Sequence, residues 1–193
     1  MKEINAEKDE LLLVLDENGN STGRFEQRSV VHENLLWHRE VSCIVLNKYG
    51  QILLQKRNKN KKSYPSKWAL CAGHVVNDEE PKDAVVKELS EELILPFNSR
   101  NVFSLLVGEI KNEREDNKCF VTCFWTLFEF PINQLSFQES EIEGLAWFTL
   151  DEFKRLVERE EDIFKNNDYY KSIIVALEEL LKDKKYLKKQ FEK

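Results

Sequence analysis

The chain has 193 residues, with 29 lysine and arginine residues against 35 aspartate and glutamate residues and a formal net charge of −6. This length can bury a hydrophobic core without disulfides, so a single domain over residues 1–193 is expected. The acidic balance argues against a nucleic-acid polymer as the partner. No apolar run approaches the roughly 18 residues that span a bilayer, and the charged N-terminus is unlike a secretory signal. The sequence therefore predicts a cytoplasmic protein with no membrane partner.

The first part of the chain predicts two hairpins and a basic loop. An Asn-Gly pair between extended flanks predicts an N-terminal hairpin over about residues 10–28. Two β-rich runs, 41–46 and 51–55, flank a turn and predict a second hairpin. A lysine-rich loop follows over residues 56–67.

Helix and strand signals alternate in the middle of the chain. A helix is expected over residues 80–93, with a proline in its tolerated first turn. Residues 103–109 and 119–130 are rich in β-branched and aromatic side chains and predict two strands, separated by a polar loop. Residues 145–148 predict a further short strand.

The last part of the chain predicts two helices. Thr149 and Glu152 match the capping-box pattern, so a helix is expected from there to about residue 160. Apolar residues at helical spacing predict a C-terminal helix over about residues 168–191. Strands and helices that intermix in this way indicate a layered α/β or α+β domain, without naming a fold.

Carboxylates are dense on the helix predicted at residues 80–93. At about 100° per residue, Glu88, Glu91 and Glu92 lie on one face. Like charges at these spacings destabilise a helix by about 0.2–0.5 kcal/mol per pair unless a cation compensates them. Magnesium would supply that cation, because it binds carboxylates, waters and substrate phosphate oxygens. By itself, however, such a cluster is more typical of a solvated helix face.

The longer pattern around this helix resembles the Nudix box. A glycine is followed at fixed spacing by a glutamate, a basic residue and three further glutamates, namely Gly73, Glu79, Lys87, Glu88, Glu91 and Glu92. A strand ending in Gln-Lys-Arg, a Tyr-Pro-Ser-Lys-Trp segment and Trp147 before the Thr-Leu-Asp-Glu helix start extend the similarity over about residues 10–160. The resemblance implies an α/β/α sandwich around a mixed β-sheet.

The same resemblance implies a metal-dependent hydrolase that cleaves a diphosphate bond in a small-molecule substrate. The implied metal ligands are Glu88, Glu91, Glu92 and the Gly73 carbonyl, with Glu91 and Glu92 also catalytic. The implied metal is magnesium, with manganese as the alternative. Glu79 would steady the loop against Lys87.

Basic residues near the box are candidates for binding the diphosphate. Arg57, at a predicted strand end, and Lys67 could both stabilise phosphate charge. The sequence does not choose among nucleoside diphosphates, nucleotide sugars, dinucleotides and prenyl diphosphates. It also leaves open whether the protein is a homodimer.

Two positions depart from the usual Nudix box. Lys87 stands where the family has arginine, and lysine cannot make a bidentate guanidinium contact. A weaker contact between Lys87 and the loop of Glu79 is therefore expected. Ile94 stands where the family has glycine, and a β-branched residue resists the left-handed conformation that glycine supplies after a helix. Neither change removes a carboxylate.

The histidines support a rival interpretation. His32, His38 and His74 resemble the histidines with which type 1 isopentenyl-diphosphate isomerases, which share the Nudix fold, hold a metal. In those isomerases the catalytic cysteine lies two residues before the histidine, whereas that position here is Ala72 and Cys71 is one residue farther away. A one-residue offset in a strand reverses the side-chain direction.

The sequence therefore favours a hydrolase and keeps two alternatives, an isopentenyl-diphosphate isomerase and a non-catalytic nucleotide-binding module. The histidines are either metal ligands or hydrogen-bonded structural residues.

Overall fold

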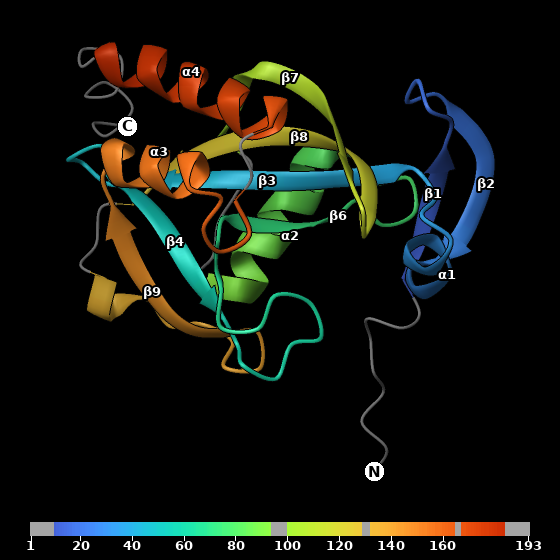
Figure 1. Ribbon diagram of the computed structural model, residues 1–193, viewed down its shortest axis with the longest axis horizontal. Helices are drawn as coiled ribbons and strands as arrows, with labels where there is room; N and C mark the ends of the chain where they lie inside the picture. The colour runs from blue at the N-terminus through green and yellow to red at the C-terminus, as the bar shows by residue number, and fades with distance from the viewer. Residues whose placement is uncertain (1–9, 94–99, 129–131, 165–166, 184–193) are drawn as a thin grey trace.

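The structure, a computed structural model, describes residues 10–93, 100–128, 132–164 and 167–183 (Figure 1). A small antiparallel sheet pairs β1 (Leu11–Leu15) with β2 (Ser21–Gln27), and the short helix α1 (Arg28–Glu33) follows it. These elements lie together at one end of the molecule, at the right of Figure 1.

A seven-stranded sheet forms the centre of the fold. Its strands are β3 (His38–Leu46), β4 (Ile52–Arg57), β5 (Trp68–Ala69), β6 (Cys71–His74), β7 (Val102–Arg114), β8 (Asn117–Leu127) and β9 (Ile142–Phe148). The order along the sheet is β5-β4-β3-β8-β7, with β6 paired to β3 and β9 paired to β4. β3 and β8 run parallel and the other described pairs run antiparallel, so the sheet is mixed.

Helices cover both faces of this sheet. The helix α2 (Pro81–Leu93) lies on one face, and α3 (Leu150–Glu158) and α4 (Asp168–Lys182) lie on the other (Figure 1). A short 3-10 helix, Ile132–Gln134, precedes β9. The predicted α/β/α sandwich around a mixed sheet is confirmed.

The alternation of side chains along β3 divides the core into two halves. Val41, Cys43 and Val45 point to the α2 side, where they share a hydrophobic cluster with Leu89. The intervening Ile44 and Leu46 belong to the other cluster, together with residues of α3 and α4. The strand is buried on both faces and is therefore apolar at nearly every position after Glu40.

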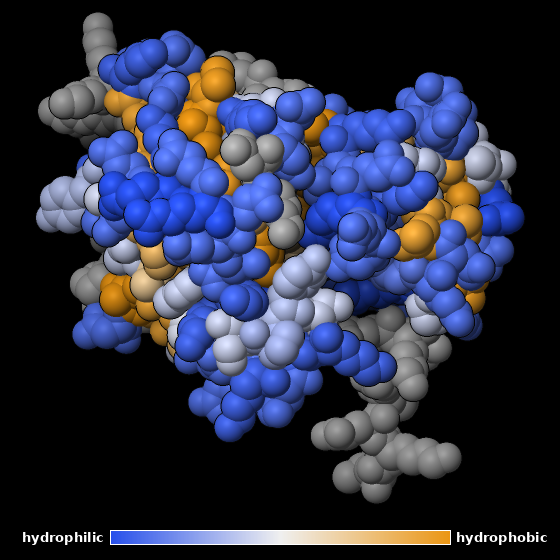
Figure 2. Space-filling model, viewed as in Figure 1, coloured by the Kyte–Doolittle hydropathy of each residue, from blue (hydrophilic) through white to orange (hydrophobic). Residues whose placement is uncertain are grey.

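The N-terminal elements have only a small core of their own. Leu12, Val14 and Val31 are buried there, with parts of Leu36 and Val76 packed against them. On the outer face Leu11 and Phe25 remain 40% and 41% exposed. Figure 2 shows hydrophobic side chains gathered on this hairpin, while hydrophilic residues cover most of the visible face.

Most of the predicted elements are confirmed, with three differences. The polar stretch predicted as a loop after residue 109 instead continues β7 to Arg114, because an edge strand can turn charged side chains to water. The C-terminal helix ends at Lys182, and residues 184–193 of its predicted extent lie outside the described residues. α1, β5 and β6 were not predicted, being too short to show a periodic pattern.

The start of α3 agrees with the sequence signal. Thr149 and Glu152 form the predicted capping box, with Glu152 N donating to Thr149 Oγ1 at 3.2 Å and Thr149 N donating to Glu152 Oε2 at 2.7 Å. α2 ends at Leu93, while Ile94 lies outside the described residues. None of the described helices is both long and apolar enough to cross a membrane.

Candidate functional site

The backbone of Gly73 lies directly against the side chain of Glu88, where β6 faces α2. A Cβ atom on Gly73 would lie 2.1 Å from Glu88 Cδ and 2.2 Å from Glu88 Oε1. Ordinary carbon contacts are about 3.5–4.0 Å, so only glycine leaves room for this carboxyl group. The structure thus brings together two residues that the sequence predicts as metal ligands.

Glu92, one turn further along α2, is buried beside Glu88. Gln55 Nε2 donates a 3.0 Å hydrogen bond to Glu92 Oε2, and the Cys71 thiol also donates to this carboxyl group. Burial raises the pKa of Glu92 to about 7. Burial, followed by the charges of Glu92 and Glu91, raises the pKa of Glu88 to about 8. A nearby cation would favour the charged form of both groups.

Of the two predicted substrate-binding residues, Arg57 lies near this acidic pair, and Lys67 is joined to Arg57 through the backbone. The charge of Arg57 acts to lower the pKa of Glu92. Arg57 Nε donates to the Ser63 carbonyl at 3.0 Å, and Arg57 N donates to the Lys67 carbonyl at 2.9 Å. The basic loop is therefore anchored at the end of β4, on the side where Glu92 lies.

The other predicted residues of the box lie outside the buried pair of Glu88 and Glu92. Glu91 is exposed on α2, although its charge reaches Glu88. Glu79 Oε1 accepts a 2.7 Å hydrogen bond from Val76 N, which fixes the loop before α2. Within the described chain Glu79 makes no ion pair with Lys87, which is exposed.

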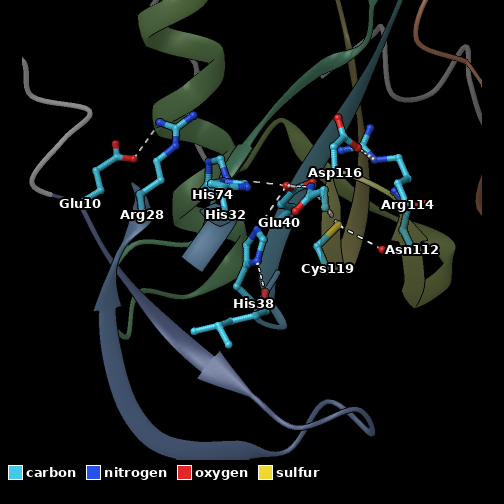
Figure 3. Close-up of polar contacts among 12 residues, drawn as sticks. Glu10, Arg28, His32, His38, Glu40, His74, Asn112, Arg114, Asp116 and Cys119 are labelled. Atoms are coloured by element: carbon cyan, nitrogen blue, oxygen red, sulfur yellow. Dashed lines mark hydrogen bonds and ion pairs between the residues drawn. The ribbon is translucent and has the colours of Figure 1, made fainter. Parts of the chain in front are cut away.

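The three histidines converge on a second centre, although they come from different elements (Figure 3). His32 lies on α1, His38 on β3 and His74 on β6, and each offers one nitrogen within 4.8 Å of the others. His32 Nε2 and His74 Nε2 are 2.9 Å apart. Among the residues that the structure describes, this is the one compact group of three or more potential metal-ligating side chains.

His38 is held in the orientation that a metal ligand requires. Its Nδ1 donates to the Leu36 carbonyl at 3.0 Å, which leaves Nε2 facing Glu40. That Nε2 atom is buried and has no hydrogen-bond partner. Burial lowers the pKa of His32 to about 4 and holds the pKa of His74 well below its usual range. Burial thus favours the neutral imidazoles of His32 and His74, the form that binds a metal.

Glu40 adds a carboxylate to the histidine centre. Its Oε1 lies 3.4 Å from His38 Nε2 and 3.7 Å from His74 Nε2. Asn117 Nδ2 donates to this oxygen at 2.7 Å, and the Cys119 thiol donates to Oε2 at 3.3 Å. Glu40 is not among the residues predicted from the sequence, although its position two residues after His38 on a strand was a usable signal, since such residues share a face.

The two centres lie on opposite faces of the sheet. Gly73 pairs with Val41 on the α2 side, and the next residue, His74, pairs with Glu40 on the other side. Cys71 pairs with Cys43 and therefore faces α2, whereas exposed Ala72 shares the face of His74. The predicted reversal of Cys71 is confirmed, so its thiol points away from the histidines.

Comparisons with known proteins agree with this arrangement. The family model of the NUDIX domain matches residues 36–166. The chain is 33% identical over 149 residues to the isopentenyl-diphosphate Delta-isomerase of Saccharopolyspora erythraea, covering 72% of this chain and 71% of that protein. It is 26% identical over 161 residues to Nudix hydrolase 3 of Arabidopsis thaliana, covering 78% of this chain and 21% of that protein. A solved structure of a Deinococcus radiodurans protein matches with a TM-score of 0.67 and 19% identity, covering 79% of this chain and 91% of that one.

A mixed sheet between helical layers, with a glutamate-bearing helix packed on a glycine of the sheet, defines an α/β/α protein with an acidic centre. The chain belongs to the Nudix family. Membership of this family indicates an enzyme that acts on a small phosphorylated substrate. The relatives include a hydrolase and an isomerase, so the family does not determine which reaction is catalysed.

Proposed function

We propose that this protein is a metal-dependent hydrolase that cleaves a diphosphate bond in a small substrate. The observation that carries the proposal is the packing of the Glu88 carboxyl group on Gly73, beside buried Glu92. Two acidic groups in this environment have pKa values of about 8 and 7, so their charged forms need a cation. A hard divalent ion matches these oxygen ligands.

The residues of the acidic centre have distinct roles in this proposal. Glu88, Glu91, Glu92 and the Gly73 carbonyl would hold magnesium, or manganese in its place. Such an ion lowers the pKa of an attacking water and neutralises charge on the phosphoryl oxygens. Gln55 orients Glu92 through its amide hydrogen bond. Arg57 and Lys67 would hold the anionic part of the substrate.

We also propose that the histidine centre binds a metal of a different kind. Three imidazole nitrogens and one carboxylate suit zinc, cobalt, manganese or iron, whereas magnesium prefers oxygen ligands alone. The position of His38 Nε2 supports this fit, because this buried atom lies 3.4 Å from the Glu40 carboxylate and makes no hydrogen bond.

A second candidate function is isomerisation of isopentenyl diphosphate. The histidine triad and the similarity to the Saccharopolyspora erythraea isomerase favour it. Against it stands Cys71, which faces α2 and hydrogen-bonds to Glu92, with burial raising its pKa well above the usual range. A thiol on the far side of the sheet cannot deliver a proton to a substrate held at the histidines. The third alternative, a non-catalytic nucleotide-binding module, leaves the buried acidic pair without a role.

The test is a product analysis with a panel of substrates. The protein is incubated with magnesium and nucleoside diphosphates, nucleotide sugars, dinucleotides and isopentenyl diphosphate, and the products are identified by mass and by isomer composition. The proposal expects cleavage of a diphosphate bond that is lost in Glu92→Gln and retained in Glu80→Gln, a control at an exposed glutamate just before α2. An allylic isomer whose formation depends on Cys71 would establish the isomerase instead. Nucleotide binding without turnover of any compound would favour the non-catalytic nucleotide-binding module.

A further inference from the structure

The outer strand of the N-terminal hairpin, β2, has an unpaired edge. Among the described strands β2 pairs with β1 alone, and it lies at the outer side of the molecule in Figure 1. An unpaired edge presents backbone N–H and C=O groups with which another strand can pair. Proline and lysine commonly block such pairing, and β2 (Ser21–Gln27) contains neither residue.

Hydrogen bonding within the hairpin shows which backbone groups of β2 point to this edge. Arg28 N donates to the Glu10 carbonyl at 2.8 Å, so these two residues form a hydrogen-bonded pair at the end of the ladder. Such pairs recur at every second residue of an antiparallel ladder, which makes Leu13 and Phe25 a pair without hydrogen bonds between them. The N–H and C=O groups of Phe25 therefore point away from β1, to the unpaired edge.

The side chains around Phe25 form an apolar strip that ends at the same edge. Leu13 pairs with Phe25, and Leu11 lies two residues before Leu13, so the three side chains share one face of the hairpin. Leu11 and Phe25 are about two-fifths exposed, and Figure 2 shows hydrophobic side chains gathered on this hairpin. A further strand along β2 would extend this strip and cover part of it.

The charges that flank Phe25 match a second copy of the same strand. Arg24 and Glu26 lie 3.5 Å apart within β2 and are both partly exposed. If two copies pair antiparallel with the two-fold axis at Phe25, Arg24 of each copy lies opposite Glu26 of the other. Opposite charges and aromatic side chains that face each other across a ladder both stabilise it. The strand is thus self-complementary, as an interface between two identical copies requires.

We infer that two copies of this chain form a dimer through β2, paired antiparallel around Phe25, so that the two hairpins join into one four-stranded sheet. Each Phe25 N–H donates to the Phe25 carbonyl of the other copy, and the Gln27 N–H donates to the Gly23 carbonyl of the other copy. The Leu13 and Phe25 side chains of both copies then form one continuous apolar face. The inference does not depend on which reaction the protein catalyses.

Sedimentation equilibrium of the full chain tests this inference. Because small interfaces bind weakly, the series covers about 1 μM to 1 mM, and the mass should rise towards twice the 22.9 kDa of one chain. Arg24→Glu places like charges opposite each other at two symmetry-related positions and should weaken the dimer about 10-fold. The double variant Arg24→Glu with Glu26→Arg restores opposite charges and should restore the wild-type Kd.

A second ion pair in the chain supplies the matched control. Arg159 and Glu161 have the same spacing in the sequence, lie 3.5 Å apart and are exposed beside the end of α3. Arg159→Glu makes the same change of charge away from β2 and should leave the Kd of the dimer unchanged. Thermal unfolding of each variant checks that the exposed substitutions leave the fold intact.

Cross-linking through Phe25→Cys tests the position of the two-fold axis. Residues of a hydrogen-bonded antiparallel pair have Cα atoms about 5.5 Å apart, within the range that a disulfide spans, so a thiol oxidant such as diamide should link the two copies. Ser21→Cys is the control, because its two copies would lie roughly 26 Å apart at about 3.3 Å per residue. The native cysteines are buried, which leaves the introduced thiol as the accessible one.

The outcomes decide the inference without any measurement of turnover. A monomer over the whole concentration series would overturn it, as would a dimer that Arg24→Glu and Arg159→Glu weaken equally or not at all. Cross-linking of Ser21→Cys as complete as that of Phe25→Cys would exclude pairing around Phe25. Because no substrate is present, a failure of the hydrolase proposal would leave these results unaffected.

Discussion

Replacement of Gly73 by alanine tests whether the glycine exists to admit the Glu88 carboxyl group. The new Cβ would lie 2.1 Å from Glu88 Cδ, where about 3.5 Å is the ordinary contact distance, so the carboxyl group must move by more than about 1 Å. A displacement of this size at a catalytic centre costs on the order of 100-fold in rate. Because the displaced atoms end a flexible side chain, the loss of folding stability should not exceed about 1–3 kcal/mol.

The assay is kcat/KM for the diphosphate substrate identified in the panel, with magnesium affinity and urea unfolding measured on the same samples. Gly144→Ala is the matched control, because its Cβ would meet only Lys56 Cβ at 4.0 Å and it also lies in a strand. The double variant Gly73→Ala with Glu88→Ala should recover most of the lost stability and none of the activity. Wild-type activity and magnesium affinity in Gly73→Ala, or an equal loss in Gly144→Ala, would refute the reasoning.

Three further predictions follow from the acidic centre and from the capping box. Burial raises the pKa of Glu88 to about 8 and of Glu92 to about 7, so the folded chain holds more protons than the unfolded chain above about pH 5. Stability from these groups is therefore present at low pH and lost as the pH rises to 8. Thermal unfolding should show a larger rise in Tm with magnesium at pH 8 than at pH 6, and Glu88→Gln should reduce that difference to the part that Glu92 contributes; an unchanged difference would contradict the role of Glu88. The Gln55 hydrogen bond lowers the pKa of Glu92, so Gln55→Leu should shift the acid limb of the kcat/KM profile to higher pH, and an unshifted limb would exclude this role. Thr149→Ala removes the cap of α3 and should cost about 1 kcal/mol in urea unfolding without changing kcat, whereas no measurable loss would show the cap to be dispensable.

Helix periodicity explains why the clustering of glutamates on α2 could be predicted from the sequence. Glu88, Glu91 and Glu92 lie within two turns of one helix, so their shared face follows from helix geometry alone. Gly73 was predicted through the resemblance to the Nudix box, in which the spacing between the glycine and the helix is fixed. The same reasoning placed Cys71 and His74 on opposite faces, since alternation along a strand depends only on the parity of the offset.

Contacts between distant segments could not be predicted in this way. Gln55 reaches Glu92 across 37 positions, and no local pattern marks a strand glutamine as the partner of a helix glutamate. The histidine centre joins α1, β3 and β6, and α1 itself was too short to be recognised. Asn117 and Cys119 reach Glu40 only because β8 runs parallel to β3, a pairing that depends on the topology of the whole sheet.

Binding of magnesium or manganese at the acidic centre of Glu88 and Glu92 is tested most directly by anomalous diffraction from crystals grown with manganese and a non-hydrolysable diphosphate. We predict a manganese peak bounded by the Gly73 carbonyl and the carboxylates of Glu88 and Glu92, with the diphosphate oxygens completing its coordination. Manganese at the histidines with none beside Glu88 and Glu92, and a diphosphate bound on the face of His74, would contradict it.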